Sequence, residues 1–291
     1  MPPRVVPRPR VVCDAFRMHS SIELMDLAAT LAREAGELVI QGRARAAVTS
    51  TKTSPIDIVT QMDVAAETLL RSRLAEKRPD DAILGEEGEE TAGTSGVTWV
   101  VDPIDGTVNY LYGLPHFAVS VAAVEGGTDP ATWRILAGAV YGGDGVGWKA
   151  AAGHGAWRNG EPLVRSGGPT LSATLLGTGF NYIADRRAAQ GKIISQVLPQ
   201  VRDIRRLGSA AVDLCLVAEG KLDAYYEHGL HPWDFAAGAL IASEAGVKVA
   251  GIDGGAADSH LLIAAVESVW DELRDALDAA GARRPWDSPG A

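Results

Sequence analysis

Two aspartates separated by two residues form the most informative segment of the sequence, because they can place two carboxylates in one small volume. Asp102 follows the apolar run 99–101, and Asp105 comes after Pro103, which stiffens the turn between them. Two carboxylates held together repel each other unless a proton or a cation lies between them. Hard oxygen ligands without a histidine favour magnesium over zinc. The segment therefore predicts a magnesium site.

The two residues after this pair add a place for a phosphate group. Gly106 lets the backbone approach a ligand closely, and the N–H groups of Gly106 and Thr107 are predicted to cradle a phosphate at the start of a short helix. Asp-Pro and Asp-Gly are each ordinary turn dipeptides. Finding Asp, Pro, Asp, Gly and Thr in one register has a chance rate on the order of 10⁻⁶ per window, which favours a functional site over a plain turn.

Other acidic residues lie at the ends of predicted elements. Glu86 follows the apolar run 82–84 directly, although Glu89 and Glu90 nearby are also consistent with a solvated edge. Asp234 is placed at a predicted helix start, where its alternative role is to cap the helix. Asp57 alone is equally consistent with a cap or a turn. A strand that ends in carboxylates places them at the edge of a sheet, where ligands commonly bind.

Hydrophobic periodicity predicts the elements that must position these residues. The predicted helices span residues 22–42, 65–77, 183–198, 209–220, 234–246 and 269–280. The predicted strands span 82–84, 98–101, 117–124, 135–141, 146–151, 175–180, 222–226, 247–252 and 261–266, with a hairpin turn at Asn159-Gly160. Residues 44–60 show little periodicity and are predicted to form a mobile loop.

The pattern predicts one mixed α/β domain over residues 20–285, made of two interlocked halves at about 20–165 and 166–285. Residues 1–19 are basic and rich in proline without the apolar core of a signal peptide, and we expect a disordered leader there. Residues 286–291 are expected to form a tail.

The composition excludes several classes of protein. The chain has 291 residues, 46% of them hydrophobic, and a formal net charge of −10, which argues against binding to nucleic acid. Two cysteines do not suggest a disulfide framework, and Cys215, in an apolar run, is predicted to be a small buried residue. No apolar stretch has the ~20 residues of a membrane span. These features predict a cytoplasmic protein.

Four motifs together resemble the inositol monophosphatase family in order and spacing. They are Asp57, Gly85-Glu86-Glu87, residues 102–107 (Asp-Pro-Ile-Asp-Gly-Thr) and residues 233–238 (Trp-Asp-Phe-Ala-Ala-Gly). The resemblance covers about residues 22–280. It implies an α/β (α+β) fold, a layered αβαβα sandwich of the inositol monophosphatase/fructose-1,6-bisphosphatase type. It also implies a lithium-sensitive, magnesium-dependent phosphatase that is usually a homodimer.

The resemblance further implies roles for individual residues. The groups that would hold two or three Mg²⁺ ions are Glu86, Asp102, the Ile104 carbonyl, Asp105 and Asp234. The groups that would orient the attacking water are Thr107 and Glu86, with Asp57 supporting them. The residues that would bind the substrate are Gly106, Thr107, Ser209, Ala210, Glu227 and Asp234. Of these, Glu227 and Ala210 would face the hydroxyl groups of inositol.

The expected reaction is the hydrolysis of a small phosphate monoester, with myo-inositol monophosphate giving myo-inositol and phosphate as the first expectation. Related phosphatases act on histidinol phosphate, fructose 1,6-bisphosphate or 3′-phosphoadenosine 5′-phosphate, and the metal motifs do not choose among these substrates. Some bacterial relatives act as accessory factors in transcription or ribosome assembly. An intact set of ligands argues against a purely non-catalytic role but leaves room for a second one.

Overall fold

Helix α1 (Ser21–Gly42) is the first element of this computed structural model, which describes residues 20–45, 48–52 and 58–284. Ser20 caps the helix by accepting a hydrogen bond from the N–H of Glu23, as its capping sequence predicts. Helix α2 (Gln61–Lys77) begins before residue 65, where periodicity alone predicted it. The reason is a capping box at the first turn. The N–H of Thr60 donates to Asp63 Oδ2, and the Thr60 hydroxyl oxygen accepts from the N–H of Met62.

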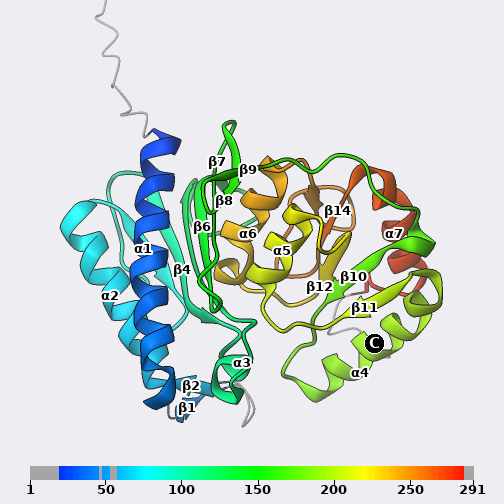
Figure 1. The fold of residues 1–291 in the computed structure, drawn as a ribbon, viewed down its shortest axis with the longest axis horizontal. Helices are drawn as coiled ribbons and strands as arrows, with labels where there is room; N and C mark the ends of the chain where they lie inside the picture. Colours follow the sequence, from blue (N-terminus) through cyan, green and yellow to red (C-terminus); the bar gives the residue numbers. More distant parts are fainter. Residues whose placement is uncertain (1–19, 46–47, 53–57, 285–291) are drawn as a thin grey trace, which may run out of the picture.

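A seven-stranded sheet forms the next layer (Figure 1). Its strands, in the order in which they lie side by side, are β3 (Ala82–Gly85), β4 (Val97–Asp105), β5 (Ala118–Glu125), β6 (Arg134–Gly142), β7 (Gly147–Ala151), β8 (Gly155–Arg158) and β9 (Glu161–Leu163). β3 runs parallel to β4, and the later pairs are antiparallel. Trp99 and Val101 of β4 pack in the hydrophobic cluster beneath α1 and α2.

The opposite face of this sheet is also buried. Val100, which alternates with Trp99 and Val101, packs in a second cluster with Ala211 of α5 (Ala210–Glu219) and Ile241 of α6 (Pro232–Glu244). A strand that is buried on both faces reads as a continuous apolar run. This explains why residues 97–101 are hydrophobic almost without interruption.

A five-stranded sheet lies on the far side of α5 and α6 (Figure 1). Its order is β11 (Asp203–Arg205), β10 (Leu175–Thr178), β12 (Ala224–Glu227), β14 (Leu262–Ala265) and β13 (Lys248–Ala250). Helices α4 (Ala184–Val197) and α7 (Glu267–Ala279) cover its outer face through a further cluster. The layers therefore alternate as α, β, α, β, α, and the predicted sandwich is confirmed.

The differences from the predicted elements are local. Residues 44–60 were expected to form a loop, yet they contain the short antiparallel pair β1 (Val48–Thr51) and β2 (Ile58–Thr60). β11 was not predicted. The turn at Asn159 and Gly160 is confirmed, because both residues have the positive φ, 48° and 88°, that this hairpin type requires.

Three further sequence predictions concern burial and the termini. Cys215 is fully buried, as expected of a small apolar residue. Among the described residues, no helix has the length and apolar character needed to cross a membrane. The expected leader and tail lie outside the described residues.

Candidate active site

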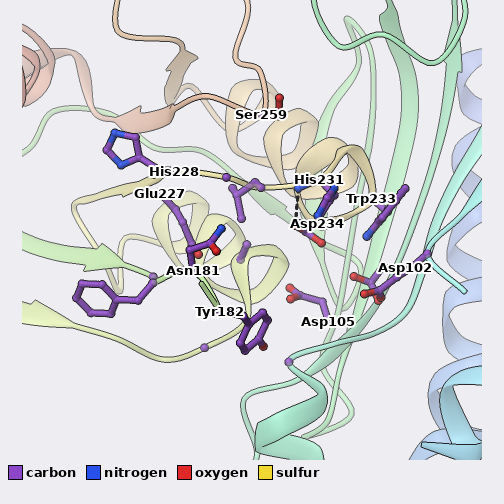
Figure 2. Close-up of a pocket in the computed structure, with 18 of the residues that line it drawn as sticks. Asp102, Asp105, Asn181, Tyr182, Glu227, His228, His231, Trp233, Asp234 and Ser259 are labelled. Carbon is purple, nitrogen blue, oxygen red and sulfur yellow. Dashed lines mark hydrogen bonds between the residues drawn. The ribbon is translucent and has the colours of Figure 1, made fainter. Parts of the chain in front are cut away.

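A cavity of about 770 Å³ opens where the end of β4 meets the first turns of α5 and α6. Figure 2 shows side chains from both halves of the chain facing this space, with Asp102, Asp105 and Asp234 gathered at one side. Among the predicted site residues, those that line it are Glu86, Asp102, Ile104, Asp105, Gly106, Thr107, Ala210, Glu227 and Asp234. The fold therefore brings together residues from each of the motifs within its described part.

A β-bulge explains how Asp102 and Asp105 come to share one side of β4. Asp102 is paired with Ser120, and Asp105 with Ala118, so β4 holds one residue more than β5 over the same length. In a regular strand, residues three apart point to opposite faces. The extra residue in the bulge brings Asp102 and Asp105 to the same face of β4, and both carboxylates point into the cavity. The backbone N–H of Ile104 donates a hydrogen bond to the side-chain atom Asp102 Oδ1 (2.9 Å), which fixes the turn.

Asp105 is held by the second half of the chain. The Ser209 hydroxyl and the Ala211 N–H both donate to Asp105 Oδ2, each at 2.7 Å. Burial raises the pKa of Asp105 to about 7, although these hydrogen bonds oppose the shift, and the nearby charges of Glu227 and Glu86 add to it.

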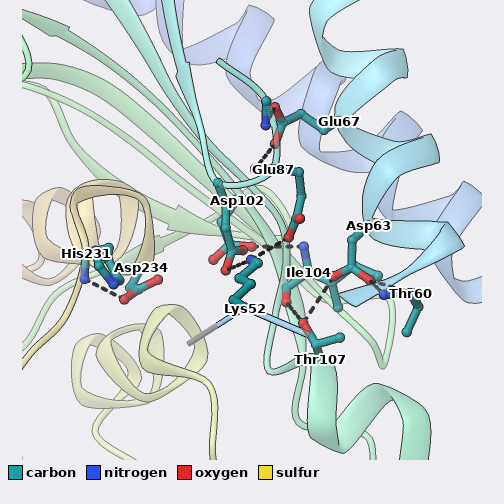
Figure 3. Close-up of polar contacts among 12 residues, drawn as sticks. Lys52, Thr60, Asp63, Glu67, Glu87, Asp102, Ile104, Thr107, His231 and Asp234 are labelled. Atoms are coloured by element: carbon teal, nitrogen blue, oxygen red, sulfur yellow. Dashed lines mark hydrogen bonds and ion pairs between the residues drawn. The ribbon is translucent and has the colours of Figure 1, made fainter. Parts of the chain in front are cut away.

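The pKa values of Asp234 and Asp102, like that of Asp105, are raised by their surroundings. Asp234 lies in the first turn of α6 and accepts a hydrogen bond from the N–H of His231 at 2.7 Å (Figures 2 and 3). Burial, followed by repulsion from neighbouring carboxylates, raises the pKa of both Asp102 and Asp234 well above the ordinary value. The N-cap of α6 is His231, so Asp234 is not itself the cap; it lies two residues further into the helix than Pro232, closes a capping box with the His231 N–H, and also lines the cavity.

Glu86 and Glu87 follow β3 and contact the cationic side chain of Lys52; Figure 3 shows Glu87 beside Lys52. Lys52 Nζ lies 2.6 Å from Glu86 Oε1 and 2.6 Å from Glu87 Oε1. Burial raises the pKa of Glu87 to about 7 in spite of the Lys52 ion pair. The exposed Glu89 and Glu90 belong to the solvated edge that the sequence left open as an alternative.

The Thr107 hydroxyl contacts a carboxylate that the sequence analysis did not select. Thr107 Oγ1 lies 3.1 Å from Asp63 Oδ1 and 2.9 Å from the Ile104 carbonyl oxygen (Figure 3). Both partners can only accept, so the hydroxyl proton is committed to one of them. The lone pairs of the Thr107 oxygen therefore remain available to accept a hydrogen bond from a water molecule in the cavity.

Two predicted substrate contacts differ in their placement. Ala210 lines the cavity, whereas Ser209 is buried and its hydroxyl is committed to Asp105. Ser209 is thus placed to position a carboxylate, and the substrate contact expected of it has no support in this geometry. Glu227 stands at the end of β12 and faces the cavity (Figure 2). Asp57 lies outside the described residues, and its role stays a prediction.

Lys52, Asp63 and Glu67 contribute to the site although sequence reasoning passed over them. Glu67 is 2% exposed, and its carboxylate accepts hydrogen bonds from the N–H groups of Glu87 and Gly88, each at 2.8 Å (Figure 3). Only Asp63 carried a usable signal, because Thr60 and Asp63 have the spacing of a capping box. Lys52 has no local signal, since its partners are 34 and 35 residues away. The local signal of Glu67 is an i,i+4 pair with Arg71, which indicates only a helix face and not the contact with the loop after β3.

Comparison with known proteins gives the same result as the geometry. The sequence profile of the inositol monophosphatase family matches residues 22–281. An inositol-1-monophosphatase from Mycobacterium leprae is 48% identical over 249 residues, 81% of this chain and 83% of that protein. Nus factor SuhB from Escherichia coli is 36% identical over 269 residues, 87% of this chain and 98% of that protein.

Solved structures agree at the level of the fold. Mycobacterium tuberculosis SuhB has a TM-score of 0.77 and 43% identity, and the match covers 91% of this chain and 100% of that one. An IMPase from Thermotoga maritima also has a TM-score of 0.77, with 31% identity over 88% of this chain and 96% of that one. The match spans both sheets and all the acidic motifs within the described residues, so the chain belongs to the inositol monophosphatase family.

Proposed function

We propose that this protein is a magnesium-dependent phosphatase that hydrolyses a small phosphate monoester, with myo-inositol monophosphate as the first substrate to test. One observation carries the proposal. Three aspartates, the buried Asp102 and the partly buried Asp105 and Asp234, border a cavity that also holds a threonine hydroxyl paired with Asp63. The mycobacterial relative named as an inositol-1-monophosphatase supports the same reaction.

The donor set fits Mg²⁺ by its chemistry. It consists of carboxylates and a carbonyl oxygen, without the histidine and cysteine groups that favour zinc. Within the described residues, no three acidic, histidine or cysteine side chains are already closed around a common point. The fit therefore depends on the burial and mutual repulsion of the carboxylates, which raise their pKa values and which a cation would relieve.

The groups proposed to hold two or three Mg²⁺ ions are Glu86, Asp102, the Ile104 carbonyl, Asp105 and Asp234. When bound, Mg²⁺ supplies charge neutralisation at the phosphate and favours deprotonation of the attacking water. The Thr107 oxygen accepts a hydrogen bond from that water, and Asp63 fixes the hydroxyl orientation that makes this possible. The N–H groups of Gly106 and Thr107 are proposed to contact the phosphate. Gly106 has a φ of 93°, which an L residue rarely adopts.

The leaving alcohol would lie on the side of the cavity formed by the second half of the chain. Glu227 and Ala210 stand there, with Asn181 and His260 also in the lining. A carboxylate suits the hydroxyl groups of a polyol, which supports inositol over a purely aromatic alcohol. Histidinol phosphate, fructose 1,6-bisphosphate and 3′-phosphoadenosine 5′-phosphate remain alternatives that share the metal site.

The experiment is to measure phosphate release from these four substrates, in Mg²⁺ and in EDTA. We expect release to require Mg²⁺ and the highest kcat/KM on myo-inositol monophosphate. Release that continues in EDTA would contradict the metal-dependent mechanism. A higher kcat/KM on another member of the panel would change the substrate and leave the reaction class intact. Inhibition by lithium, a homodimer in sedimentation analysis and a cytoplasmic location are further proposals that rest on family membership.

A second role is proposed on one observation. The relative from Escherichia coli, which aligns over 98% of its length, carries the name Nus factor. A variant with the metal site disabled, such as Asp105→Asn, would separate the two roles in a deletion strain of the source organism. Rescue by this variant would show a function carried by the protein surface, and failure to rescue would leave catalysis as the required activity.

A further inference from the structure

Gly177 on β10 and Gly179, one residue past the end of that strand, lie beside the side chains of Tyr225 and Glu227 on β12. The strands are parallel neighbours, with Gly177 paired with Tyr225 and Thr178 with Tyr226. Continuing the register by one residue places Gly179 beside Glu227. Because side chains alternate between faces along a strand, Gly177 and Gly179 share a face, and so do Tyr225 and Glu227. The absence of side chains at Gly177 and Gly179 therefore leaves room for those two residues on β12.

The space at each glycine is already filled by its neighbour. A methyl group on Gly177 would lie 3.1 Å from Cδ2 of the Tyr225 ring and 2.9 Å from a Leu222 methyl. A methyl group on Gly179 would overlap all three atoms of the Glu227 carboxyl group. Neither glycine has a positive φ, so the backbone itself permits alanine at both positions. What Gly179 provides is space for the Glu227 carboxylate.

The same carboxylate is held from its other side by a buried hydroxyl. Tyr225 is fully buried, and its hydroxyl donates a hydrogen bond to Glu227 Oε2. A buried tyrosine hydroxyl needs a partner, and this one finds it two residues along the same strand. Burial raises the pKa of Tyr225, which keeps the group protonated and therefore a donor.

We propose that Gly179 and Tyr225 are the positioning residues that direct the Glu227 carboxylate into the cavity, and that they thereby set the preference for a polyol as the leaving alcohol. Gly179 gives the carboxylate its place, and the Tyr225 hydroxyl fixes one oxygen. The other oxygen is left to accept hydrogen bonds from vicinal hydroxyl groups. This inference rests on the proposed function, because it assigns a part of the same cavity to the alcohol.

Gly179→Ala is the variant that tests the space. The atoms that would have to move are the far end of a flexible side chain, so the protein should fold and Glu227 should turn away. The matched control is Gly191→Ala, in helix α4, where an added methyl group meets no atom within 4 Å. Tyr225→Phe and Glu227→Gln complete the set.

The readout is the ratio of kcat/KM on the preferred polyol phosphate to kcat/KM on an aryl phosphate. We expect the ratio to fall about tenfold or more in Gly179→Ala, mainly through KM, because a hydrogen bond to a charged group is lost. Tyr225→Phe should lower the ratio in the same direction. Combining Gly179→Ala with Glu227→Gln should lower it no further than Glu227→Gln alone, because both act through one carboxylate. Gly191→Ala should keep the wild-type ratio.

Two results would overturn the inference, and they differ from those that would overturn the phosphatase. A ratio unchanged in Gly179→Ala would show that the glycine does not set selectivity. A crystal structure of that variant with Glu227 still beside the Tyr225 hydroxyl would show that the space is not needed, whatever the activity. Failure of the wild-type protein to hydrolyse any substrate would instead contradict the proposed function, and the same crystal structure would still decide the positioning of Glu227.

Discussion

Each aspartate at the cavity has its own hydrogen-bond donor. Ile104 N–H serves Asp102, Ser209 and Ala211 serve Asp105, and His231 N–H serves Asp234. These contacts orient the carboxylates before any cation arrives, which is the form of preorganisation that electrostatic catalysis requires. The removal of one charge should therefore affect chemistry far more than shape.

Asp105→Asn tests this distinction. The amide oxygen can still accept from Ser209 and Ala211, while the loss of charge relieves repulsion from Glu227 and Glu86. We expect kcat/KM to fall about a thousandfold, or ~4 kcal/mol of transition-state stabilisation, with the fold retained. Steady-state kinetics at saturating Mg²⁺ and urea unfolding check both parts. A variant with more than about a tenth of wild-type activity would contradict the ligand assignment.

Asp63→Asn and Asp57→Asn separate two candidates for the partner of Thr107. An asparagine at 63 can still cap helix α2 through its oxygen, but its amide does not draw the Thr107 proton as a carboxylate does. We expect kcat to fall about a hundredfold in Asp63→Asn, with little change in KM, and less in Asp57→Asn. Comparing the two kcat values decides the matter, and a larger loss in Asp57→Asn would return the supporting role to that residue.

The sequence predicted the acidic residues that share a short motif and missed those whose partners are distant. Asp102 and Asp105 could be found because a turn brings them together. Asp63 contacts Thr107 across 44 residues of sequence, and its local signal, a capping box with Thr60, indicates only a helix start. Ser209 was selected as a substrate contact through the family resemblance, and its hydroxyl contacts Asp105, a partner 104 residues away that no local pattern indicates.

At the scale of elements, the loop after β3 is shaped by helix α2. The Glu67 carboxylate accepts the N–H groups of Glu87 and Gly88, and Arg71 Nε lies 2.7 Å from Glu67 Oε1. A methyl group at Gly85 or Gly88 would collide with Glu67, so the loop closes tightly over this side chain. The position of Glu86 thus depends on a helix that supplies no residue to the proposed metal site.

Glu67→Gln should weaken Mg²⁺ binding, because the amide offers the loop only one acceptor oxygen and no charge for Arg71. We expect the Kd for Mg²⁺ in calorimetry to rise about tenfold, as for other residues that orient metal ligands. Glu76→Gln is the control, since Glu76 lies on the same helix with its side chain 60% exposed. Equal Mg²⁺ affinities in the two variants would show that Glu67 does not position Glu86.

The long elements could be predicted because their periodicity is strong, while short ones could not. Helix α1 and strands β5 and β6 follow the predicted spans closely. Strand β11 (Asp203–Arg205) is too short and too exposed to have a pattern, and tertiary pairing with β10 alone creates it. The bulge in β4 was also beyond prediction, because it depends on the register against β5.

At the scale of the whole molecule, the acidic cavity makes stability depend on pH. Burial raises the pKa of Asp105, Glu87 and Glu227 to about 7 in the folded protein. Unfolded carboxyl groups titrate near ~4, so between about pH 4 and pH 7 the folded chain binds more protons. The contribution of these groups to stability is therefore largest at low pH and is lost as the pH rises through 7.

We expect the metal-free protein to have a lower Tm at pH 8 than at pH 5.5, and Mg²⁺ to raise the Tm more at pH 8. Thermal unfolding in EDTA and in excess Mg²⁺ at both pH values is the measurement. Glu227→Gln removes one of the titrating groups and should reduce the difference between the two pH values. A metal-free Tm that rises from pH 5.5 to pH 8 would contradict the pKa shifts.

The hydrogen bonds that Ser209 and Ala211 donate to Asp105 also have a consequence for the polypeptide while it is synthesised on the ribosome. Domains generally fold as units while the N-terminal part emerges first. Asp105 is made 104 residues before Ser209 and 106 before Ala211. A nascent chain that has completed the first sheet therefore carries Asp105 beside Asp102 without the two donors that hold the Asp105 carboxylate in the finished protein. Asp105 can be oriented only after the start of α5 has been translated, and Asp234 is supplied only with α6, so premature termination before them yields no partial enzyme.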